Sequence, residues 1–199
     1  MHEAKTNAVR IVETAKIDHE VTTYGGTEPL DGVSVAGKLG VDVEYVFKTL
    51  VTQGKSGGYF VFVVPAAEEL DLKKAARASG EKSIEMIPVK DINKVTGYVR
   101  GGCSPVGMKK PYPTFIDETA LLCDRIYVSA GRIGSQLHIG PEDLARLVGA
   151  QFVDLTTKEF FRPKPNKQYR VAEVGTNYSS NGDMTHVYTL TTTCCQIDL

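Results

Sequence analysis

The chain has 199 residues, of which 42% are hydrophobic and 24% are charged. At about 150 residues per domain, this length predicts one domain with an additional segment, and the composition excludes an intrinsically disordered chain. The 23 basic and 24 acidic residues leave a formal net charge of −1. Such a balance argues against a protein that binds nucleic acid through a large positive net charge alone, although a local basic patch is compatible with it.

Features of membrane, metal and disulfide proteins are missing from the sequence. The longest apolar run, residues 59–67, is about half of the roughly 20 residues that span a bilayer, and the first residues lack the apolar core of a signal peptide. The four histidines are far apart, and the four cysteines form no CxxC pair. We therefore expect a cytoplasmic protein with free thiols, no metal and no cofactor.

Helix and strand signals alternate irregularly through the first half of the chain. Each predicted helix begins at a Ser, Thr or Asp that can cap it, and two of them end before a glycine, Gly40 or Gly80. The predicted caps are Thr6, Ser34, Asp42, Asp71 and Asp91. Runs of β-branched and aromatic residues predict strands at 19–24, 46–52, 59–64 and 84–87.

A long loop rich in glycine and proline, residues 97–113, interrupts this pattern, and such loops in compact domains are usually functional. After it we expect a helix at 141–148 with Pro141 in its first turn, and four strands. These strands cover residues 114–116, 125–129, 136–139 and 152–155. The sequence therefore predicts an α/β (α+β) fold with a mixed, barrel-like sheet of about six or seven strands and surrounding helices, and the irregular element order disfavours a doubly wound sheet.

The predicted domain covers residues 1–156, and residues 157–199 form a C-terminal extension of different character. Thr, Ser and Asn are frequent within residues 176–193. Strand-like residues nevertheless occur at Val187, Tyr188 and Leu190. We expect the extension to be either a loosely packed hairpin or a partly disordered tail.

Common catalytic signatures such as GxGxxG, the P-loop, HExxH and GxSxG do not occur, which leaves three smaller groups of residues. The first is Lys48, which lies in a predicted strand with Val46 and Leu50 on its own face. Burying a lysine charge is costly, so a lysine on an apolar face is unusual and makes Lys48 a candidate functional residue. The alternative is a lysine that protects a sheet edge from aggregation.

Two further segments combine small and basic residues. In 101–105, glycines let the backbone approach a ligand closely, and the flanking Arg100, Lys109 and Lys110 are candidates for RNA phosphates. In 127–132, a strand of small residues ends in a turn, as at the floor of a pocket. Each segment is equally compatible with an ordinary turn.

Together these segments resemble the YbaK/EbsC family of Cys-tRNA(Pro)/Cys-tRNA(Cys) deacylases, within the superfamily of prolyl-tRNA synthetase editing domains. The resemblance extends over about residues 5–156, and the order and spacing of its pieces carry it. The matching pieces are residues 5–8, 46–50, 69–74, 96–110 and 126–131.

The resemblance implies a YbaK-like editing domain with a pocket for the aminoacylated 3′ end of a tRNA. It assigns catalysis to Lys48 and to the backbone N–H groups of Gly101 and Gly102, which would stabilise the oxyanion. The implied substrate-binding residues are Tyr24, Thr49, Cys103, Ser104, Pro105 and Ser129, and the candidates for tRNA contacts are Arg100, Lys109, Lys110 and Arg132. The family often has Asp where this chain has Gln136, so no carboxylate acts at that position here.

Family members are thought to use the thiol of the cysteinyl substrate as the nucleophile, so that the protein mainly orients the substrate and stabilises charge. Under this mechanism Cys103 is a small loop residue, and we expect the Cys103→Ala variant to keep most of the activity. The requirement for a substrate thiol would reject alanine and proline chemically, where pocket size alone discriminates by roughly 10–200-fold.

The implied partners are mischarged tRNA, Cys-tRNA(Pro) above all, and prolyl-tRNA synthetase, which would bind the tRNA in one complex with this weakly charged protein. Three alternatives stay open. They are a water-dependent deacylase of another mischarged tRNA such as Ala-tRNA(Pro), a non-catalytic module that binds tRNA or the synthetase, and a metal or redox protein based on Cys194 and Cys195.

Overall fold

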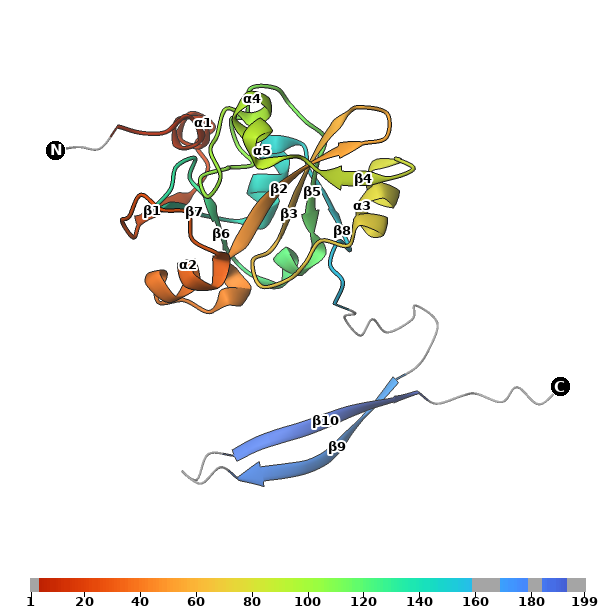
Figure 1. Ribbon diagram of the computed structural model, residues 1–199. Helices are drawn as coiled ribbons and strands as arrows, with labels where there is room; N and C mark the ends of the chain where they lie inside the picture. Colours follow the sequence, from red (N-terminus) through yellow and green to blue (C-terminus); the bar gives the residue numbers. More distant parts are fainter. Residues whose placement is uncertain (1–3, 159–168, 179–183, 193–199) are drawn as a thin grey trace. The chain divides into compact units, whose positions relative to one another are not determined.

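The computed structural model describes residues 4–158, 169–178 and 184–192. By its contacts the chain divides into two compact units, residues 1–158 and residues 159–199. Of the described elements, the helices and two of the sheets belong to the first unit, and a two-stranded hairpin belongs to the second (Figure 1).

The larger sheet of the first unit has the strand order β4-β2-β3-β5-β8. Its members are β4 (Ile84–Met86), β2 (Phe47–Gly54), β3 (Tyr59–Pro65), β5 (Thr114–Asp117) and β8 (Gln151–Val153). β2 pairs antiparallel with β3 and β4, whereas β5 runs parallel to both β3 and β8. The central strand β3 is buried on both faces, which explains its unbroken apolar sequence.

The smaller sheet is antiparallel, with the order β1-β7-β6. Its strands are β1 (His19–Thr23), β7 (Ser135–Ile139) and β6 (Ile126–Ser129). The two sheets meet through an isolated parallel bridge between Val46 and Tyr127. The mixed α/β class is therefore confirmed. The expected barrel of six or seven strands is not, because residues 4–158 form eight strands in two sheets that this bridge does not close.

Five α-helices and three 3₁₀ turns surround the sheets in this unit. They are α1 (Asn7–Thr14), α2 (Gly32–Leu39), η1 (Val43–Tyr45), α3 (Leu72–Ser79), η2 (Val89–Asp91), α4 (Ile92–Thr96), η3 (Glu118–Leu122) and α5 (Pro141–Val148). The predicted caps Thr6 and Asp71 are confirmed, since their side chains accept backbone N–H groups of the first turn. Pro141 is in the first turn of α5, as predicted.

Three predicted caps do not cap a helix with their side chains. Asp42 has the N-cap position of η1 but makes no side-chain hydrogen bond to it. α2 is capped by Asp31 and not by Ser34, because the Asp31 carboxylate accepts the N–H groups of both Val33 and Ser34 and also the Ser34 hydroxyl. One carboxylate thus satisfies two of the open N–H groups at the helix start. Asp91 makes no side-chain cap for α4, because it is the last residue of the preceding turn η2 and has a helical backbone.

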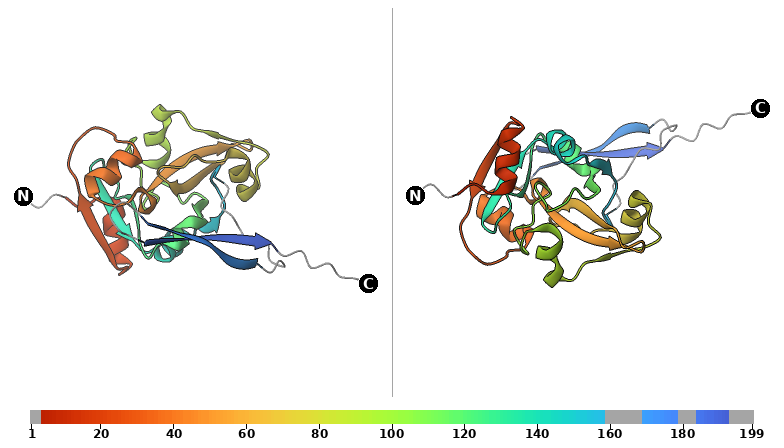
Figure 2. Two further views of the ribbon diagram at one scale, coloured as in Figure 1. Left: turned by 90° about the horizontal axis from the view of Figure 1, so that it is seen from below. Right: turned by 90° about the horizontal axis from the view of Figure 1, so that it is seen from above.

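The core lies on both faces of the larger sheet. On one face, apolar residues of α1, α5, β6 and β7 form one cluster with Phe47, Val63 and Ile116. On the other face, α3 packs against Phe60 and Phe62. Figures 1 and 2 show α1 at the end of this unit that holds the smaller sheet and α3 at the opposite end, beside β4. This arrangement leaves one edge of β2 next to the smaller sheet.

The second unit is a hairpin of β9 (Tyr169–Tyr178) and β10 (Met184–Thr192), with a register shift between Val187 and Tyr188. All three residues that the sequence indicates as strand-like lie in β10. Cys194 and Cys195 lie outside the described residues. Within the described part of the chain, no helix has the length and apolar character needed to cross a membrane.

Candidate functional site

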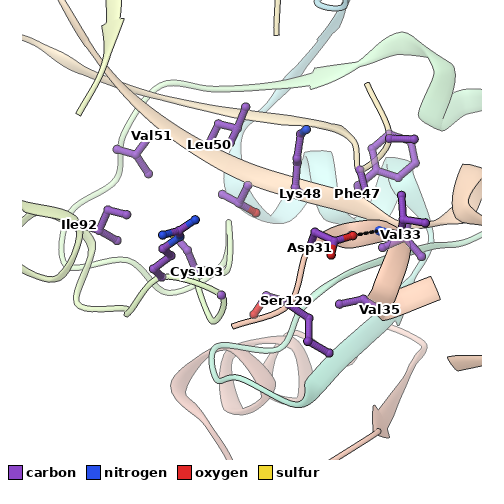
Figure 3. Close-up of a pocket in the computed structure, with 18 of the residues that line it drawn as sticks. Asp31, Val33, Val35, Phe47, Lys48, Leu50, Val51, Ile92, Cys103 and Ser129 are labelled. Carbon is purple, nitrogen blue, oxygen red and sulfur yellow. Dashed lines mark hydrogen bonds between the residues drawn. The ribbon is translucent and has the colours of Figure 1, made fainter. Parts of the chain in front are cut away.

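A cavity of about 650 Å³ lies along β2 in the first unit (Figure 3). Its walls come from β2, the start of α2, the segment after β3, the β4–α4 region, residues 100, 101 and 103, and the paired ends of β6 and β7. Aliphatic side chains alternate with a few polar ones around it, which is the usual composition of a small-molecule site.

The cavity arises because one edge of β2 is only partly paired. β4 pairs with β2 over residues 52–54, and β6 meets it only at Val46. Between these points, the described strands provide no neighbour on that edge for residues 48–50. Side chains from both faces of the strand, together with its backbone, are therefore accessible to a ligand at this place.

Lys48 lies at the rim of the cavity. Lys48 and Leu50 project from one side of β2, whereas Cys103 and Ser129 lie on the other side (Figure 3). The Lys48 side chain is 29% exposed, and its Nζ is 3.7 Å from Oε1 of Glu69, a residue that is 84% exposed. A long ion pair with so exposed a partner is weak, so the ammonium can exchange Glu69 for a phosphate without a large cost.

Three polar side chains belong to the interior of the cavity. Thr49 follows Lys48 and so points to the opposite face of β2, while Ser129 and Gln136 are directly paired across β6 and β7. Ser129 Oγ accepts the N–H of Gly131 at 3.2 Å. Thr49 Oγ1 and Gln136 Oε1 are buried without a hydrogen-bond partner. Two residues of the cavity wall thus have an oxygen whose capacity for a hydrogen bond is not used by the described residues.

The glycines of the 97–113 loop are required by close packing. A Cβ on Gly101, whose φ is +80°, would lie 2.8 Å from Cβ of Pro29. A Cβ on Gly102 would lie 2.9 Å from Cα of Arg132. The loop is therefore held between the segment before α2 and the turn after β6, which brings Gly101 to the cavity wall.

Part of the predicted 101–105 site does not reach the cavity. The N–H of Gly102 donates to the carbonyl of Val99 at 3.0 Å. This N–H is therefore used inside the loop, and the expectation that it stabilises an oxyanion was wrong. Ser104 is fully buried, and its hydroxyl accepts the N–H of Val106. Gly102, Ser104 and Pro105 are absent from the cavity wall, to which Gly101 and Cys103 contribute.

Cys103 lines the cavity as a protonated thiol. Burial raises the pKa of Cys103 to about 11, although a hydrogen bond with the Thr96 side chain partly opposes this shift. The thiolate is the reactive form of cysteine, and it is scarce at neutral pH when the pKa is this high. Cys103 is consequently a poor nucleophile.

The four basic candidates for tRNA contacts have different surroundings. Arg100 is exposed at the cavity wall, and Lys110 is exposed elsewhere on the loop. The Lys109 ammonium donates to the carbonyl of Asn93 at 2.9 Å, at the end of α4, which explains its position without a ligand. Arg132 donates to the carbonyl of Ala4 at 3.3 Å.

Tyr24 does not line the cavity; it packs against the cluster that includes Val35, Val46 and Ala66. Two acidic residues that the sequence reasoning did not select do line it, Glu69 and Asp31. The hydrogen bond from the Ser34 hydroxyl lowers the pKa of Asp31, whose carboxylate caps α2. A cap followed by a glycine was the only signal for Asp31. Across the described residues, no cluster of three or more His, Cys, Asp or Glu side chains could hold a metal ion.

Comparison with known proteins identifies the fold and the family. The model of the aminoacyl-tRNA editing domain family matches residues 29–147. A solved structure assigned as a trans-editing enzyme for prolyl-tRNA synthetase superposes with a TM-score of 0.68 at 26% identity, covering 78% of this chain and 100% of that one. A second, at 21% identity and a TM-score of 0.69, shares the fold over 76% of this chain and 99% of its own.

Two relatives match at the level of sequence. EbsC of Enterococcus faecalis, assigned as a Cys-tRNA(Pro)/Cys-tRNA(Cys) deacylase, is 47% identical over 156 residues, which is 78% of this chain and 95% of EbsC. A proline–tRNA ligase of Fervidobacterium nodosum is 37% identical over 75 residues, 38% of this chain but 13% of the ligase. The chain therefore belongs to the aminoacyl-tRNA editing domain family and is an aminoacyl-tRNA deacylase.

Proposed function

We propose that this protein removes cysteine from mischarged Cys-tRNA(Pro), and also from Cys-tRNA(Cys), and that the substrate's own thiol is the nucleophile. The observation that carries the proposal is a cavity with a cation at its rim and no activated nucleophile of its own. Its protein thiol, Cys103, has a pKa raised by burial to about 11, and no histidine is among the described residues that line the cavity. The resemblance to EbsC supports cysteine as the amino acid.

In the proposed reaction the cysteinyl sulfur attacks its own ester carbonyl carbon. The new C–S bond closes a four-membered thiolactone, the C–O bond to the ribose breaks, and the thiol proton ends on the ribose oxygen. The tRNA leaves with a free 3′-terminal hydroxyl, and the thiolactone hydrolyses to cysteine in water. Because nucleophile and carbonyl are in one molecule, the protein contributes mainly orientation and charge stabilisation.

Each wall has a role in this reaction. Lys48, at the rim, binds the phosphate or ribose of the terminal adenosine, while the aminoacyl group enters the interior between β2 and β7. The N–H groups of Gly101 and Cys103 are the proposed donors to the carbonyl oxygen as it becomes charged. One such donor contributes roughly 3–4 kcal/mol in other enzymes. Arg100 and Lys110 are the remaining candidates for phosphate contacts. The editing activity is placed in residues 1–156, with residues 157–199 as an extension.

The test is a deacylation assay on Cys-tRNA(Pro), Cys-tRNA(Cys), Ala-tRNA(Pro) and tRNA(Pro) charged with S-methylcysteine. We expect both cysteinyl-tRNAs to be cleared, and the alanyl and S-methyl substrates to be cleared at least 100-fold more slowly, since neither has a free thiol. Equal clearance of S-methylcysteine would refute the thiol mechanism and favour hydrolysis by water. Binding of tRNA without any deacylation would favour a non-catalytic module.

Lys48→Ala is the informative variant in the same assay. Removing a charge-assisted hydrogen bond costs about 1.5–3 kcal/mol, so kcat/KM should fall by roughly 10–100-fold. The matched control is Lys82→Ala, an exposed lysine that does not line the cavity, for which no loss is expected. Equal activity of the two variants would remove Lys48 from the site.

We further propose that the protein meets its tRNA on prolyl-tRNA synthetase. The net charge of −1 predicts weak affinity for free tRNA, and the partial match to a proline–tRNA ligase supports the relationship. Binding of tRNA(Pro) should become at least tenfold tighter when the synthetase is added. An unchanged affinity would argue for an enzyme that acts alone.

A further inference from the structure

Gln136 is a polar side chain whose surroundings leave it unsatisfied. The residue is only 5% exposed, lies in the middle of the smaller sheet between β1 and β6, and contributes to the cavity wall. Its Oε1 atom is buried and accepts no hydrogen bond from the described residues. Leaving such an acceptor unpaired destabilises the fold, so a partner from outside the protein is the economical explanation.

The position of Gln136 identifies the part of the substrate that it meets. Gln136 is the cross-strand neighbour of Ser129, which lies on the other side of β2 from Lys48 (Figure 3). In the proposed function the tRNA phosphates bind at the Lys48 rim, so the aminoacyl group, the last unit of the charged tRNA, reaches the interior. Thr49 Oγ1, the second oxygen without a partner, also belongs to this interior.

An amide oxygen only accepts hydrogen bonds, which restricts its partner further. In a cysteinyl ester the carbonyl and ester oxygens are acceptors, and the thiol is a weak donor that is consumed by the reaction. The α-amino group is the strong donor that remains, with three N–H groups when protonated. The two carboxylates of the cavity wall do not compete for it, because Glu69 pairs with Lys48 at the rim and Asp31 caps α2. Thr49 Oγ1 belongs to a hydroxyl, which can also donate, whereas Gln136 Oε1 can only accept.

We infer that Gln136 is a specificity-determining residue that accepts a hydrogen bond from the free α-amino group of the aminoacyl moiety. This inference rests on the proposed function. It implies that N-acylated substrates, including peptidyl-tRNA, are rejected, because acylation removes N–H donors and adds bulk where the side chain is nearly fully buried. A deacylase with this selection would spare the growing chains on ribosomes.

The inference is tested with two tRNA(Pro) analogues whose terminal 3′ oxygen is replaced by nitrogen. One carries alanine in a stable amide, and the other carries a propionyl group, which lacks only the α-amino group. Neither has a thiol or a cleavable ester, so their affinities do not depend on the proposed chemistry. We expect the unaltered protein to bind the alanyl analogue about tenfold more tightly, as one hydrogen bond to a charged group requires.

Gln136→Leu should abolish this preference by weakening the alanyl analogue about tenfold, while the propionyl analogue changes by less than twofold. Gln136→Glu keeps an acceptor and should keep the preference. The melting temperature of Gln136→Leu should not fall, since an unsatisfied buried oxygen has been removed. In the deacylation assay, N-acetyl-Cys-tRNA(Pro) should react at least tenfold more slowly than Cys-tRNA(Pro).

Several outcomes would overturn the inference. One is equal affinity of both analogues for the unaltered protein, and another is a preference that persists in Gln136→Leu. Equal weakening of both analogues in that variant, with a lower melting temperature, would show a merely structural role. If neither analogue binds the unaltered protein, the proposed aminoacyl pocket fails first and this inference fails with it.

Discussion

Buried polar groups behave differently in two regions of the domain. At the end of β5, Asp117 is 1% exposed, and its carboxylate accepts hydrogen bonds from the N–H and hydroxyl of Thr119 and from the N–H of Leu155. Along the cavity, Thr49 and Gln136 each bury an oxygen that has no partner. The protein's own atoms therefore provide hydrogen-bond partners for Asp117, whereas the two side-chain oxygens of Thr49 and Gln136 have none among the described residues.

The groups without a partner are concentrated on two strands. Among the described side chains, buried atoms without a hydrogen-bond partner occur in Thr49 on β2 and in Ser135, Gln136 and His138 on β7, although Nδ1 of His138 is 3.6 Å from Oε2 of Glu20. Of these four residues, Thr49 and Gln136 line the cavity. An unsatisfied buried polar atom costs about 1–3 kcal/mol, and proteins tolerate such costs mainly at functional sites. Asp117, whose carboxylate is fully used, therefore holds the fold together, whereas Thr49 and Gln136 at the cavity wall each have an oxygen left for a ligand.

The largest expected effect is a loss of stability at Asp117, where the fold itself supplies every hydrogen-bond partner named above. Asp117→Ala removes an acceptor from one buried donor, the N–H of Leu155, and from two partly buried donors of Thr119. We expect the free energy of unfolding to fall by about 3 kcal/mol. The turnover per folded molecule should stay the same, because Asp117 does not line the cavity. Urea denaturation and kcat/KM measure the two quantities.

Asp117→Asn is the matched control, since its amide keeps one acceptor oxygen, and the loss should be roughly half as large. A decrease of less than 1 kcal/mol for Asp117→Ala would show that the satisfied network contributes little. A loss of activity per folded molecule would instead connect this network to the site.

The next largest effect is expected in the 97–113 loop, which contributes Gly101 to the cavity wall. A Cβ on Gly102 would lie 2.9 Å from Cα of Arg132, and backbone atoms cannot move aside as a flexible side chain can. Gly102→Ala should therefore cost about 2 kcal/mol in stability and displace Gly101 at the cavity wall, with a lower kcat. Thermal denaturation and steady-state kinetics measure both.

Gly37→Ala is the control for this variant. Gly37 lies within α2, and no atom is within 4 Å of the Cβ it would gain. Alanine is favoured over glycine in a helix by about 0.5–1 kcal/mol, so this change should stabilise the protein. If Gly102→Ala were as benign as Gly37→Ala, close packing would not be the reason for glycine in the loop.

Local signals in the sequence predicted much of the fold. Asp71 and Gly80 delimit α3, because a cap and a left-handed glycine act on their own neighbours. The cap of a helix is harder to predict where two suitable residues lie close together. Asp31 and Ser34 are both good caps, and the choice between them depends on which one captures more N–H groups.

Only part of the candidate site can be predicted from the sequence. Lys48 is conspicuous because a charge in an apolar strand is unusual. Nothing in the sequence marks Glu69 as its partner, or Lys109 as a donor to the end of α4, since these contacts depend on how distant segments pack. A glutamine in a strand is equally typical of a solvent-facing position. That Gln136 is buried is apparent only once β1, β6 and β7 are assembled.

A smaller effect, on activity rather than stability, is expected at Thr49, whose buried hydroxyl has no hydrogen-bond partner among the described residues. Thr49→Val replaces a buried hydroxyl without a partner by a methyl group of nearly the same size. The free energy of unfolding should stay the same or rise by up to about 1 kcal/mol, whereas kcat/KM for Cys-tRNA(Pro) should fall by about 5–10-fold. This is the reverse of the pattern expected for Asp117→Ala. A less stable protein with full activity would place Thr49 among the structural residues.

The smallest effect on activity is expected for Cys103→Ala. The proposed donor at this position is the backbone N–H, which alanine retains, and kcat/KM should change by less than about threefold. Its thiol pKa, raised by burial to about 11 from 9.0, makes a separate prediction for stability. The folded protein holds this proton to a higher pH than the unfolded chain does, so the stabilisation present below pH 9 is lost as the pH rises towards 11.

In Cys103→Ala this loss should be absent, so its free energy of unfolding should vary less between pH 9 and pH 11 than that of the unaltered protein. Urea denaturation of both proteins over that range measures the contribution of Cys103, which includes the effect of its charge in raising the pKa of Tyr98. Complete loss of deacylation in Cys103→Ala would overturn the substrate-thiol mechanism, because it would make the protein's own sulfur the nucleophile. Retained activity with an unchanged pH dependence of stability would instead mean that the thiol is not shielded from solvent, and the inertness of Cys103 would then need another cause.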